Sequence, residues 1–144
     1  MRLPIQRLDP AAVLPARAHS GDAGLDLTAL HAVSIPRGAH RAVRTGIAVG
    51  IPYGHVGDVR PRSGLARRHG LTVLNSPGTI DHGYTGEIVV LLANLTGSLT
   101  ATIKAGDHIA QLVVAPIVYA ETFEVDSLPG SERGDGGFGS TGRN

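Results

Sequence analysis

The amino-acid sequence predicts an all-β protein: a jelly-roll-like barrel or sandwich of short strands with one short helix and a mobile, glycine-rich C-terminal tail. Three observations predict this class. Apolar or β-branched residues occupy every second position from Val43 to Tyr53, residues 86–95 are almost continuously apolar, and 20 glycines and 9 prolines punctuate the 144 residues. Turn residues at this density are typical of short strands with tight connections. The length fits a single domain.

The two clearest strand candidates differ in their pattern. The alternation from Val43 to Tyr53 has the period of a half-buried strand, and Gly54 ends it. The stretch from Gly86 to Leu95 does not alternate, which favours a strand that is buried on both faces. We therefore expect residues 86–95 to lie in the core.

A hairpin and a helix are also predicted. Residues 100–103 and 109–118 are strand-like and flank the segment 104–107, whose Gly106 suits the positive φ of a hairpin connection. The helix runs from Ser63 to His69, and Gly70 stands where a left-handed C-terminal cap would lie.

The C-terminal part of the chain has a different composition. Periodicity stops after Glu124, and the last fifteen residues include six glycines and almost no apolar side chains. Such a segment cannot offset the entropy of ordering by burial. We expect a β domain over residues 1–128 and a flexible arm over 129–144 that is mobile without ligand.

Composition argues against several classes of function. The formal net charge of +1 is too small for non-specific binding of nucleic acid, although twelve of the thirteen basic residues are Arg, which suits phosphate contacts. Small anions are the better expected ligands. There is no Cys for a disulfide, a nucleophile or a metal site, and neither a signal-peptide pattern nor an apolar run of about 18 residues occurs. We expect a cytoplasmic protein that does not enter membranes.

Two polar stretches in the first half of the chain could carry chemistry. In GDAGLDL (residues 21–27), Asp26 stands between two leucines that should point to the opposite face, so it is either a turn-capping residue or a functional carboxylate. In PRSGLA (residues 61–66), Arg62 and Ser63 stand at the start of the predicted helix, where free N–H groups can bind an anion. Ser63 could equally be an ordinary N-cap.

Three more such stretches follow. NSPGTIDHGYTGE (residues 75–87) combines turn residues with Ile80, Asp81 and Tyr84, a mixture that favours a tight pocket hairpin over a plain surface loop. AGDHIAQL (residues 105–112) places Gln111 in an apolar strand, where a buried amide needs hydrogen-bond partners. RGDGGFGSTG (residues 133–142) is the last.

Together these five stretches resemble, in order, the five motifs of the homotrimeric dUTPase family. The resemblance covers most of the chain. It implies a β jelly roll that forms a homotrimer, with each active site built from three subunits. It also implies hydrolysis of dUTP to dUMP and pyrophosphate, which limits uracil in DNA and supplies dUMP for thymidylate synthesis.

The resemblance also implies residue roles in catalysis. Asp81 matches the general base, which would orient and deprotonate a water for in-line attack on the α-phosphorus. Mg²⁺ would be held by phosphate oxygens and waters without direct protein ligands, with Asp26 and Gln111 as outer-shell partners through water. Three residues would hold the α/β bridge and the β-phosphate: Arg62, Ser63 and Gly64.

Selectivity for deoxyuridine is implied by the third and fifth stretches. Tyr84 would lie beneath the deoxyribose and exclude a ribose 2′-hydroxyl, and close backbone approach would leave no room for the thymine methyl group. The residues that would read uracil are Asn75, Gly78, Thr79 and Ile80. The tail would act as a lid in which Arg133 meets the γ-phosphate and Phe138 stacks on uracil, with Gly139, Ser140 and Thr141 also contacting the substrate.

One position departs from the family pattern, and two other functions remain possible. Val89 stands where many relatives carry Lys, so any contact of that Lys is lost. A dCTP deaminase of the related fold would release ammonia from dCTP. A non-enzymatic nucleotide sensor would keep the pocket but release no pyrophosphate; the presence of Asp81 argues against it.

Overall fold

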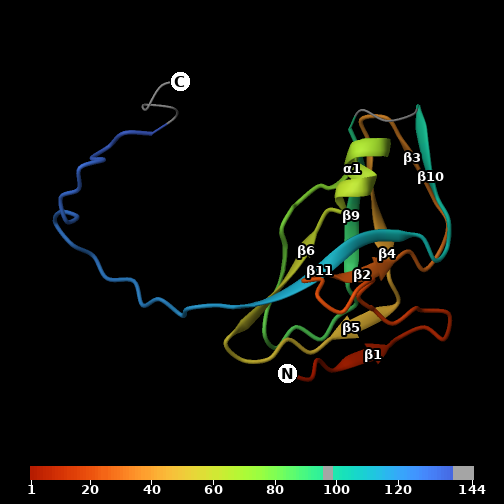
Figure 1. Cartoon of the computed structure of the whole chain (residues 1–144), viewed down its shortest axis with the longest axis horizontal. Coiled ribbons are helices and arrows are strands. Elements are labelled where there is room, and N and C mark those ends of the chain that lie inside the picture. The colour runs from red at the N-terminus through yellow and green to blue at the C-terminus, as the bar shows by residue number, and fades with distance from the viewer. Residues whose placement is uncertain (96–98, 138–144) are drawn as a thin grey trace.

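The computed structural model describes residues 1–95 and 99–137 and has antiparallel β architecture throughout. The predicted all-β class with one short helix is confirmed for these residues (Figure 1). The elements in chain order are β1 (Ile5–Arg7), β2 (Leu25–Thr28), β3 (Val33–Pro36), β4 (His40–Arg44), β5 (Ile47–Val49), β6 (His55–Arg60), α1 (Ser63–His69), β7 (Leu71–Val73), β8 (Gly78–Ile80), β9 (Val89–Asn94), β10 (Thr100–Ile103) and β11 (His108–Pro116).

Two larger sheets enclose the core. One has the strand order β2-β11-β6-β8 and the other β4-β9-β7. Their inner side chains form a single hydrophobic cluster in which Leu112 and Ile88 have no exposed surface and Leu27 and Leu92 are 1% exposed. Burial of these side chains is the main term that stabilises the fold.

The strand predicted over Val43 to Tyr53 is interrupted. Gly46 adopts a φ of 72°, and the chain divides there into β4 and β5. A Cβ at Gly46 would lie 2.8 Å from the Cβ of Ala12, so close packing also requires glycine. The predicted inward positions from Val43 to Ile51 are nevertheless buried, but the prediction is wrong at Tyr53, which is 73% exposed in the connection after β5.

The predicted core strand is confirmed over a shorter range. β9 begins at Val89 rather than Gly86. Burial on both faces holds from Leu92 to Asn94, whereas Val89 is 40% exposed. The Asn94 amide donates to the Ile35 carbonyl at 3.0 Å, which satisfies a fully buried polar group.

The predicted hairpin of residues 100–103 with 109–118 is wrong. β10 pairs with β3, while β11 pairs with β2 and β6. The turn at Gly106 exists, but it connects β10 and β11 while both stay paired with the chain from β2 to β3. At the turn, the Ala29 N–H donates to the Asp107 carbonyl at 2.9 Å, and the Gly106 N–H donates to the Ala29 carbonyl at 2.8 Å. Pairing with residues 25–36 therefore continues on both sides of the bend.

The predicted helix is confirmed. α1 spans Ser63–His69 and lies beside β7, and Gly70 ends it in the left-handed conformation with φ 61°. Its N–H donates to the Ala66 carbonyl at 3.1 Å, as a glycine C-cap does.

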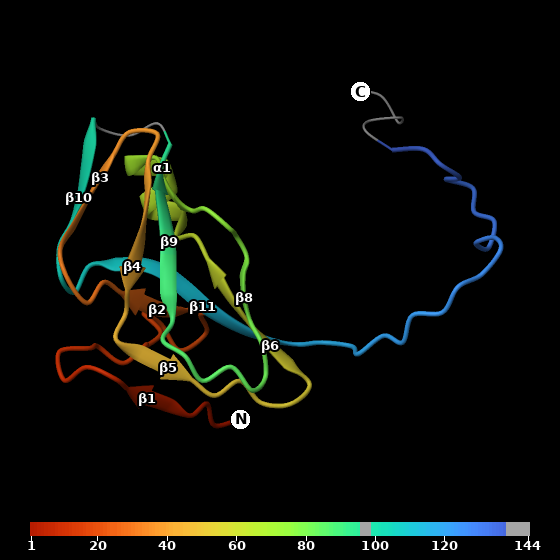
Figure 2. The same cartoon turned by 180° about the vertical axis from the view of Figure 1, so that it is seen from behind.

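The chain after β11 leaves the domain. Residues 117–137 contain no strand or helix and run away from the sheets (Figures 1 and 2). No helix of the described residues is long and apolar enough to cross a membrane.

Candidate active site

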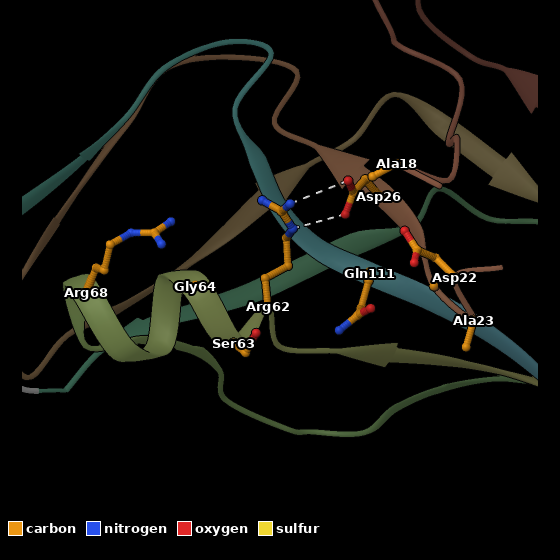
Figure 3. A pocket seen from close by; sticks show the side chains of 10 residues that line it. Ala18, Asp22, Ala23, Asp26, Arg62, Ser63, Gly64, Arg68 and Gln111 are labelled. Atoms are coloured by element: carbon orange, nitrogen blue, oxygen red, sulfur yellow. Dashed lines mark hydrogen bonds and ion pairs between the residues drawn. The ribbon is translucent and has the colours of Figure 1, made fainter. Parts of the chain in front are cut away.

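Three stretches that are far apart in the sequence line one cavity of about 320 Å³ (Figure 3). Strand register brings them together, because Gln111 in β11 lies opposite Asp26 in β2 on one side and opposite Arg60 in β6 on the other. The chain leaving β6 then starts α1 at the same edge. The lining residues are Ala18, Asp22, Ala23, Gly24, Asp26, Arg62, Ser63, Gly64, Arg68 and Gln111.

The Asp26 carboxylate makes three close contacts to side-chain nitrogen atoms at this cavity. Its Oδ1 lies 3.0 Å from Nε of Arg62, and its Oδ2 lies 3.4 Å from Nη2 of the same guanidinium. Nδ1 of His108 lies 3.1 Å from Oδ2. The Asp26 side chain is 15% exposed, so these contacts are partly shielded from water. Asp26 therefore orients Arg62, and a turn-capping role does not describe it.

The Gln111 amide has the hydrogen-bond partner that a polar group in an apolar strand requires. Its Nε2 donates to the Pro61 carbonyl at 2.9 Å, just before α1. A Cβ on Gly24 would lie 3.0 Å from Cβ of Gln111 and closer still to its Oε1, so any other residue there would require the Gln111 side chain to shift. The amide is thus held between the first and second sequence stretches.

Ser63 does not cap α1, so the N-cap interpretation is wrong. The N-cap residue is Arg62, with extended backbone at φ −92° and ψ 124°, and no side chain caps the helix. Ser63 is the first helical residue and lines the cavity with Gly64.

A second cavity of about 300 Å³ contains the predicted catalytic carboxylate. It is lined by Thr79, Ile80, Asp81, Tyr84, Glu87 and Val89. A smaller cavity of about 60 Å³ adjoins it and shares Thr79, Ile80 and Val89, and its wall includes Asn75 and Gly78. The third sequence stretch therefore forms one continuous surface, and Val89, which departs from the family pattern, is part of its wall.

The segment that carries Asp81 is held by a turn and by Glu87. The Tyr84 N–H donates to the Asp81 carbonyl at 3.2 Å, and the Tyr84 hydroxyl donates to the Glu87 carbonyl at 3.1 Å. The Glu87 carboxylate accepts from the Gly46 N–H at 2.7 Å and from Nε of Arg44 at 2.9 Å. Hydrogen bonds to the β4–β5 junction thus fix the base of the loop.

The two main cavities share no lining residue within this chain. Asp26, Arg62 and Gln111 line the first, while Asp81 and Tyr84 line the second. The residues predicted to bind phosphate lie together in the first cavity, and the residues predicted to read uracil lie with the predicted general base, Asp81, in and beside the second. Within one chain, no residue lines both main cavities.

The predicted lid residues lie apart from both cavities or outside the described residues. Arg133 is exposed, and its Nε donates to the Gly136 carbonyl at 3.0 Å within the C-terminal segment. Phe138, Gly139, Ser140 and Thr141 lie outside the described residues.

Three polar residues of the first cavity were missed by sequence reasoning. Asp22 and Arg68 line the wall, and His108 contacts Asp26. A signal for Arg68 existed, since it follows Gly64 by four positions and a helix places such residues on one face. His108 and Asp22 belong to stretches already singled out, but neither residue has a pattern that marks it alone.

The donor set of the first cavity suits a hydrated divalent cation. Asp22 and Asp26 supply carboxylate oxygens and Gln111 an amide oxygen, the ligand types that Mg²⁺ and its waters prefer. No cluster of three His, Asp or Glu side chains arranged to hold a metal occurs in residues 1–95 and 99–137. The oxygen atoms on this wall therefore suit Mg²⁺ in chemical type.

Antiparallel β sheets around a polar, arginine-containing cavity define a β protein with a candidate site for a small anion, and comparison with known proteins identifies the family. The family model for dUTPase matches residues 11–142. The chain is 54% identical to the deoxyuridine 5′-triphosphate nucleotidohydrolase of Gloeobacter violaceus, over 99% of this chain and 97% of that protein. It is 52% identical to the same enzyme of Mycobacterium marinum, over 97% and 94%. The chain belongs to the dUTPase family.

Solved structures agree with this assignment. The dUTPase of Staphylococcus bacteriophage 80alpha with dUPNHPP superposes with a TM-score of 0.91 at 30% identity, over 99% of both chains. A mutant dUTPase from phage phi11 of S. aureus, described with a structural Mg(II) ion, superposes with a TM-score of 0.82 at 27% identity, over 90% of this chain and 100% of that chain.

Proposed function

We propose that this protein hydrolyses dUTP to dUMP and pyrophosphate. One observation carries the proposal: Asp26, Arg62, Ser63, Gly64 and Gln111, which come from three separate family motifs, line one polar cavity. The deoxyuridine 5′-triphosphate nucleotidohydrolases that are 52% and 54% identical to this chain support it. The reaction limits uracil in DNA and supplies dUMP for thymidylate synthesis, and we place it in the cytoplasm.

The first cavity binds the triphosphate. Arg62, held by Asp26, presents its remaining N–H groups to the α/β bridge and the β-phosphate, while Ser63 and Gly64 bind the same oxygens at the start of α1. Negative charge builds on these oxygens as pyrophosphate leaves. A guanidinium that is already oriented therefore stabilises the transition state without further reorganisation.

The Asp81 carboxylate is the general base. It orients a water in line with the bond to the leaving group, takes a proton from it and thereby strengthens its attack on the α-phosphorus. The turn closed by the hydrogen bond from Tyr84 to Asp81 holds the carboxylate at the cavity wall. A positioned base of this kind contributes roughly 10²- to 10⁴-fold to a rate.

Mg²⁺ is the cofactor, bound by the phosphates and water. When bound, it neutralises triphosphate charge and polarises the phosphoryl oxygens. Asp26 and Gln111 act as outer-shell partners through water, which their places on the cavity wall allow.

Tyr84 and the segment after Asn75 select deoxyuridine. The Tyr84 ring lies beneath the deoxyribose, where a ribose 2′-hydroxyl would clash or lose its hydration, so UTP is rejected. Backbone groups of Gly78, Thr79 and Ile80 together with Asn75 read the uracil edge. Gly78 is packed closely, since a Cβ there would lie 3.3 Å from Nδ2 of Asn75. Close approach of this backbone to the uracil would exclude the thymine methyl group.

The active protein is a homotrimer with sites shared between subunits. Two features support this. The Asp81 cavity and the Arg62 cavity share no lining residue within one chain, as expected if each site is completed by a neighbouring subunit. The C-terminal segment carries Val118, Phe123 and Leu128 at 82% exposure or more, an arrangement that suits contact with a neighbouring chain. Its last residues form the lid, with Arg133 at the γ-phosphate, Phe138 on the uracil, and Gly139, Ser140 and Thr141 on the substrate.

Pyrophosphate release from dUTP, dTTP, dCTP and UTP with Mg²⁺ tests the proposal. We expect turnover of dUTP and rates lower by about 10²-fold or more for the others. Asp81→Asn should lower kcat by roughly 10²- to 10⁴-fold while dUTP still binds. Asp9→Asn is the matched control, because it changes a carboxylate that accepts from the Ala11 N–H and lines neither main cavity.

Two outcomes would refute the proposal. Ammonia release from dCTP without pyrophosphate release from dUTP would identify a deaminase. Tight dUTP binding by the wild-type protein without any pyrophosphate release would identify a nucleotide sensor.

A further inference from the structure

The Asp81 carboxylate sits at the first position of a tight turn. The Tyr84 N–H closes the turn on the Asp81 carbonyl at 3.2 Å, and Gly83 at its third position has a φ of 88°. A turn of this type fixes its own four residues, but it does not fix their position relative to the sheets. Another contact must hold the turn in place.

His82, the second residue of the turn, makes that contact. Its Nδ1 lies 2.8 Å from the carbonyl oxygen of Ile51, which places the proton on Nδ1 and makes the ring the donor. Ile51 is 2% exposed and belongs to the core just after β5. The residue next to Asp81 is therefore tied to a rigid part of the domain 31 residues earlier in the chain.

The His82 ring also meets an aromatic side chain. Its centroid lies 5.7 Å from that of Tyr53, with the planes at 88°, an edge-to-face contact. Tyr53 lies in the connection between β5 and β6, whose Gly54 has a φ of 77°.

The same connection holds the start of the C-terminal segment. The Tyr53 ring stacks on Tyr119, with centroids 5.1 Å apart and planes at 28°. The Ile117 N–H donates to the Gly54 carbonyl at 2.9 Å. Residues 51–54 therefore connect three parts of the molecule: the core, the turn that carries Asp81, and the start of the C-terminal segment at Ile117 and Tyr119.

We propose that His82 is a positioning residue for Asp81, and that Tyr53 links His82 to the start of the C-terminal segment through Tyr119. This rests on the proposed function, in which Asp81 activates water. In-line attack is sensitive to small displacements of the base, and an error of about 1 Å can cost about 10²-fold in rate. His82 restricts such displacement by its hydrogen bond to the core and by its packing on Tyr53. Its side chain lines neither the Asp81 cavity nor the Arg62 cavity, so it acts on Asp81 through position alone.

Variants at position 82 separate the two contacts. In His82→Ala both contacts are lost, and we expect kcat for dUTP to fall about tenfold while KM changes less than about twofold. In His82→Asn the amide can replace Nδ1 as donor to Ile51, and in His82→Phe the ring can still pack on Tyr53. Each should recover part of kcat. His31→Ala, at an exposed His that lines neither cavity, is the matched control and should behave as the wild-type protein.

Substitutions of the aromatic partners extend the test. Tyr53→Ala and Tyr119→Ala should lower kcat in the same direction, and the effects of Tyr53→Ala and His82→Ala should combine to less than their product because they break a shared contact. Loss of stability alone would appear as a lowered Tm with kcat unchanged at temperatures well below it.

The outcomes distinguish this inference from the proposed function. Wild-type turnover of dUTP with unchanged kcat in His82→Ala would overturn the inference alone. Equal losses of kcat in the Ala, Asn and Phe variants would also overturn it, because neither the hydrogen bond nor the ring contact would then restore the position of Asp81. A wild-type protein that releases no pyrophosphate would overturn both proposals.

Discussion

The guanidinium of Arg62 lies against the carboxylate of Asp26, with Nε 3.0 Å from Oδ1 and Nη2 3.4 Å from Oδ2. This ion pair joins the loop before α1 to β2 across 36 residues of sequence. Nη1 of the same guanidinium donates to the His108 carbonyl at 3.4 Å, so Asp26 and His108 together fix the orientation of the fork on the cavity wall. In the proposed function, this pair therefore sets the orientation of the guanidinium that meets the phosphates.

Arg62→Lys should be far from a conservative change. Lys keeps the charge but cannot contact Asp26 at two points and still reach a phosphate. We expect kcat/KM for dUTP to fall about 10- to 100-fold, which is about 1.4 to 2.7 kcal/mol of transition-state stabilisation. Arg41→Lys is the control, at an exposed residue whose guanidinium donates to the His40 carbonyl. Activity of Arg62→Lys within twofold of wild type would show that the fork geometry is unimportant.

Gly24→Ala should disturb the same cavity by crowding. The new Cβ would lie 3.0 Å from Cβ of Gln111 and would overlap its Oε1, so the amide must shift, which weakens its hydrogen bond to the Pro61 carbonyl. We expect the free energy of unfolding to fall by about 1 to 3 kcal/mol and KM for dUTP to rise. Gly21→Ala is the control, because nothing lies within 4 Å of its Cβ position. Equal stability of the two variants in urea unfolding would contradict the packing described.

Glu87 should matter for stability through its carboxylate. It accepts from the Gly46 N–H at 2.7 Å and from Arg44 at 2.9 Å, and its side chain is 18% exposed. Glu87→Ala leaves the Gly46 N–H without this acceptor and should lower the free energy of unfolding by about 1 to 3 kcal/mol. Glu87→Gln keeps a neutral acceptor and should lose less. Glu121→Ala, in the exposed C-terminal segment, should be neutral; if Glu87→Ala matched it in urea unfolding, the stabilising role would be wrong.

Removal of residues 131–144 tests the proposed lid. Without the fifth motif the site stays open to water and loses Arg133 at the γ-phosphate, so kcat/KM for dUTP should fall about tenfold or more. The folded domain should keep its Tm, since residues 117–137 contain no strand or helix. A chain shortened by residues 143–144 alone keeps the motif and is the control. Undiminished kcat/KM after the longer deletion would exclude the lid.

Local features of the fold were predictable from the sequence, and strand pairing was not. Gly70 marks the end of α1 because a left-handed cap depends on one residue and its neighbours. The partner of β10 depends on the whole chain: adjacency in sequence suggested β11, whereas the structure pairs it with β3. The alternation from Val43 to Ile51 identified the buried side chains correctly, but it could not reveal the break at Gly46.

The candidate site likewise has features that the sequence predicts and features that only the tertiary structure shows. Residue types and order within the five stretches were enough to resemble a family, and the register of β11 then places Gln111 opposite Asp26. The contact of His108 with Asp26 and the place of Arg68 on the cavity wall come from tertiary structure. The separation of the Asp81 cavity from the Arg62 cavity is likewise invisible in a linear sequence, because it depends on which faces of the sheets meet.

The most direct test of whether Asp81 and Arg62 of different subunits act on one nucleotide is the activity of assemblies that contain two different variants. Asp81→Asn and Arg62→Ala are each expected to be nearly inactive. When equal amounts are unfolded, mixed and refolded together, about a quarter of the shared sites would combine an intact Asp81 from one subunit with an intact Arg62 from another, so pyrophosphate release from dUTP should recover to about a quarter of the wild-type rate. Mixed trimers that form but stay as inactive as the separate variants would contradict a site shared between subunits.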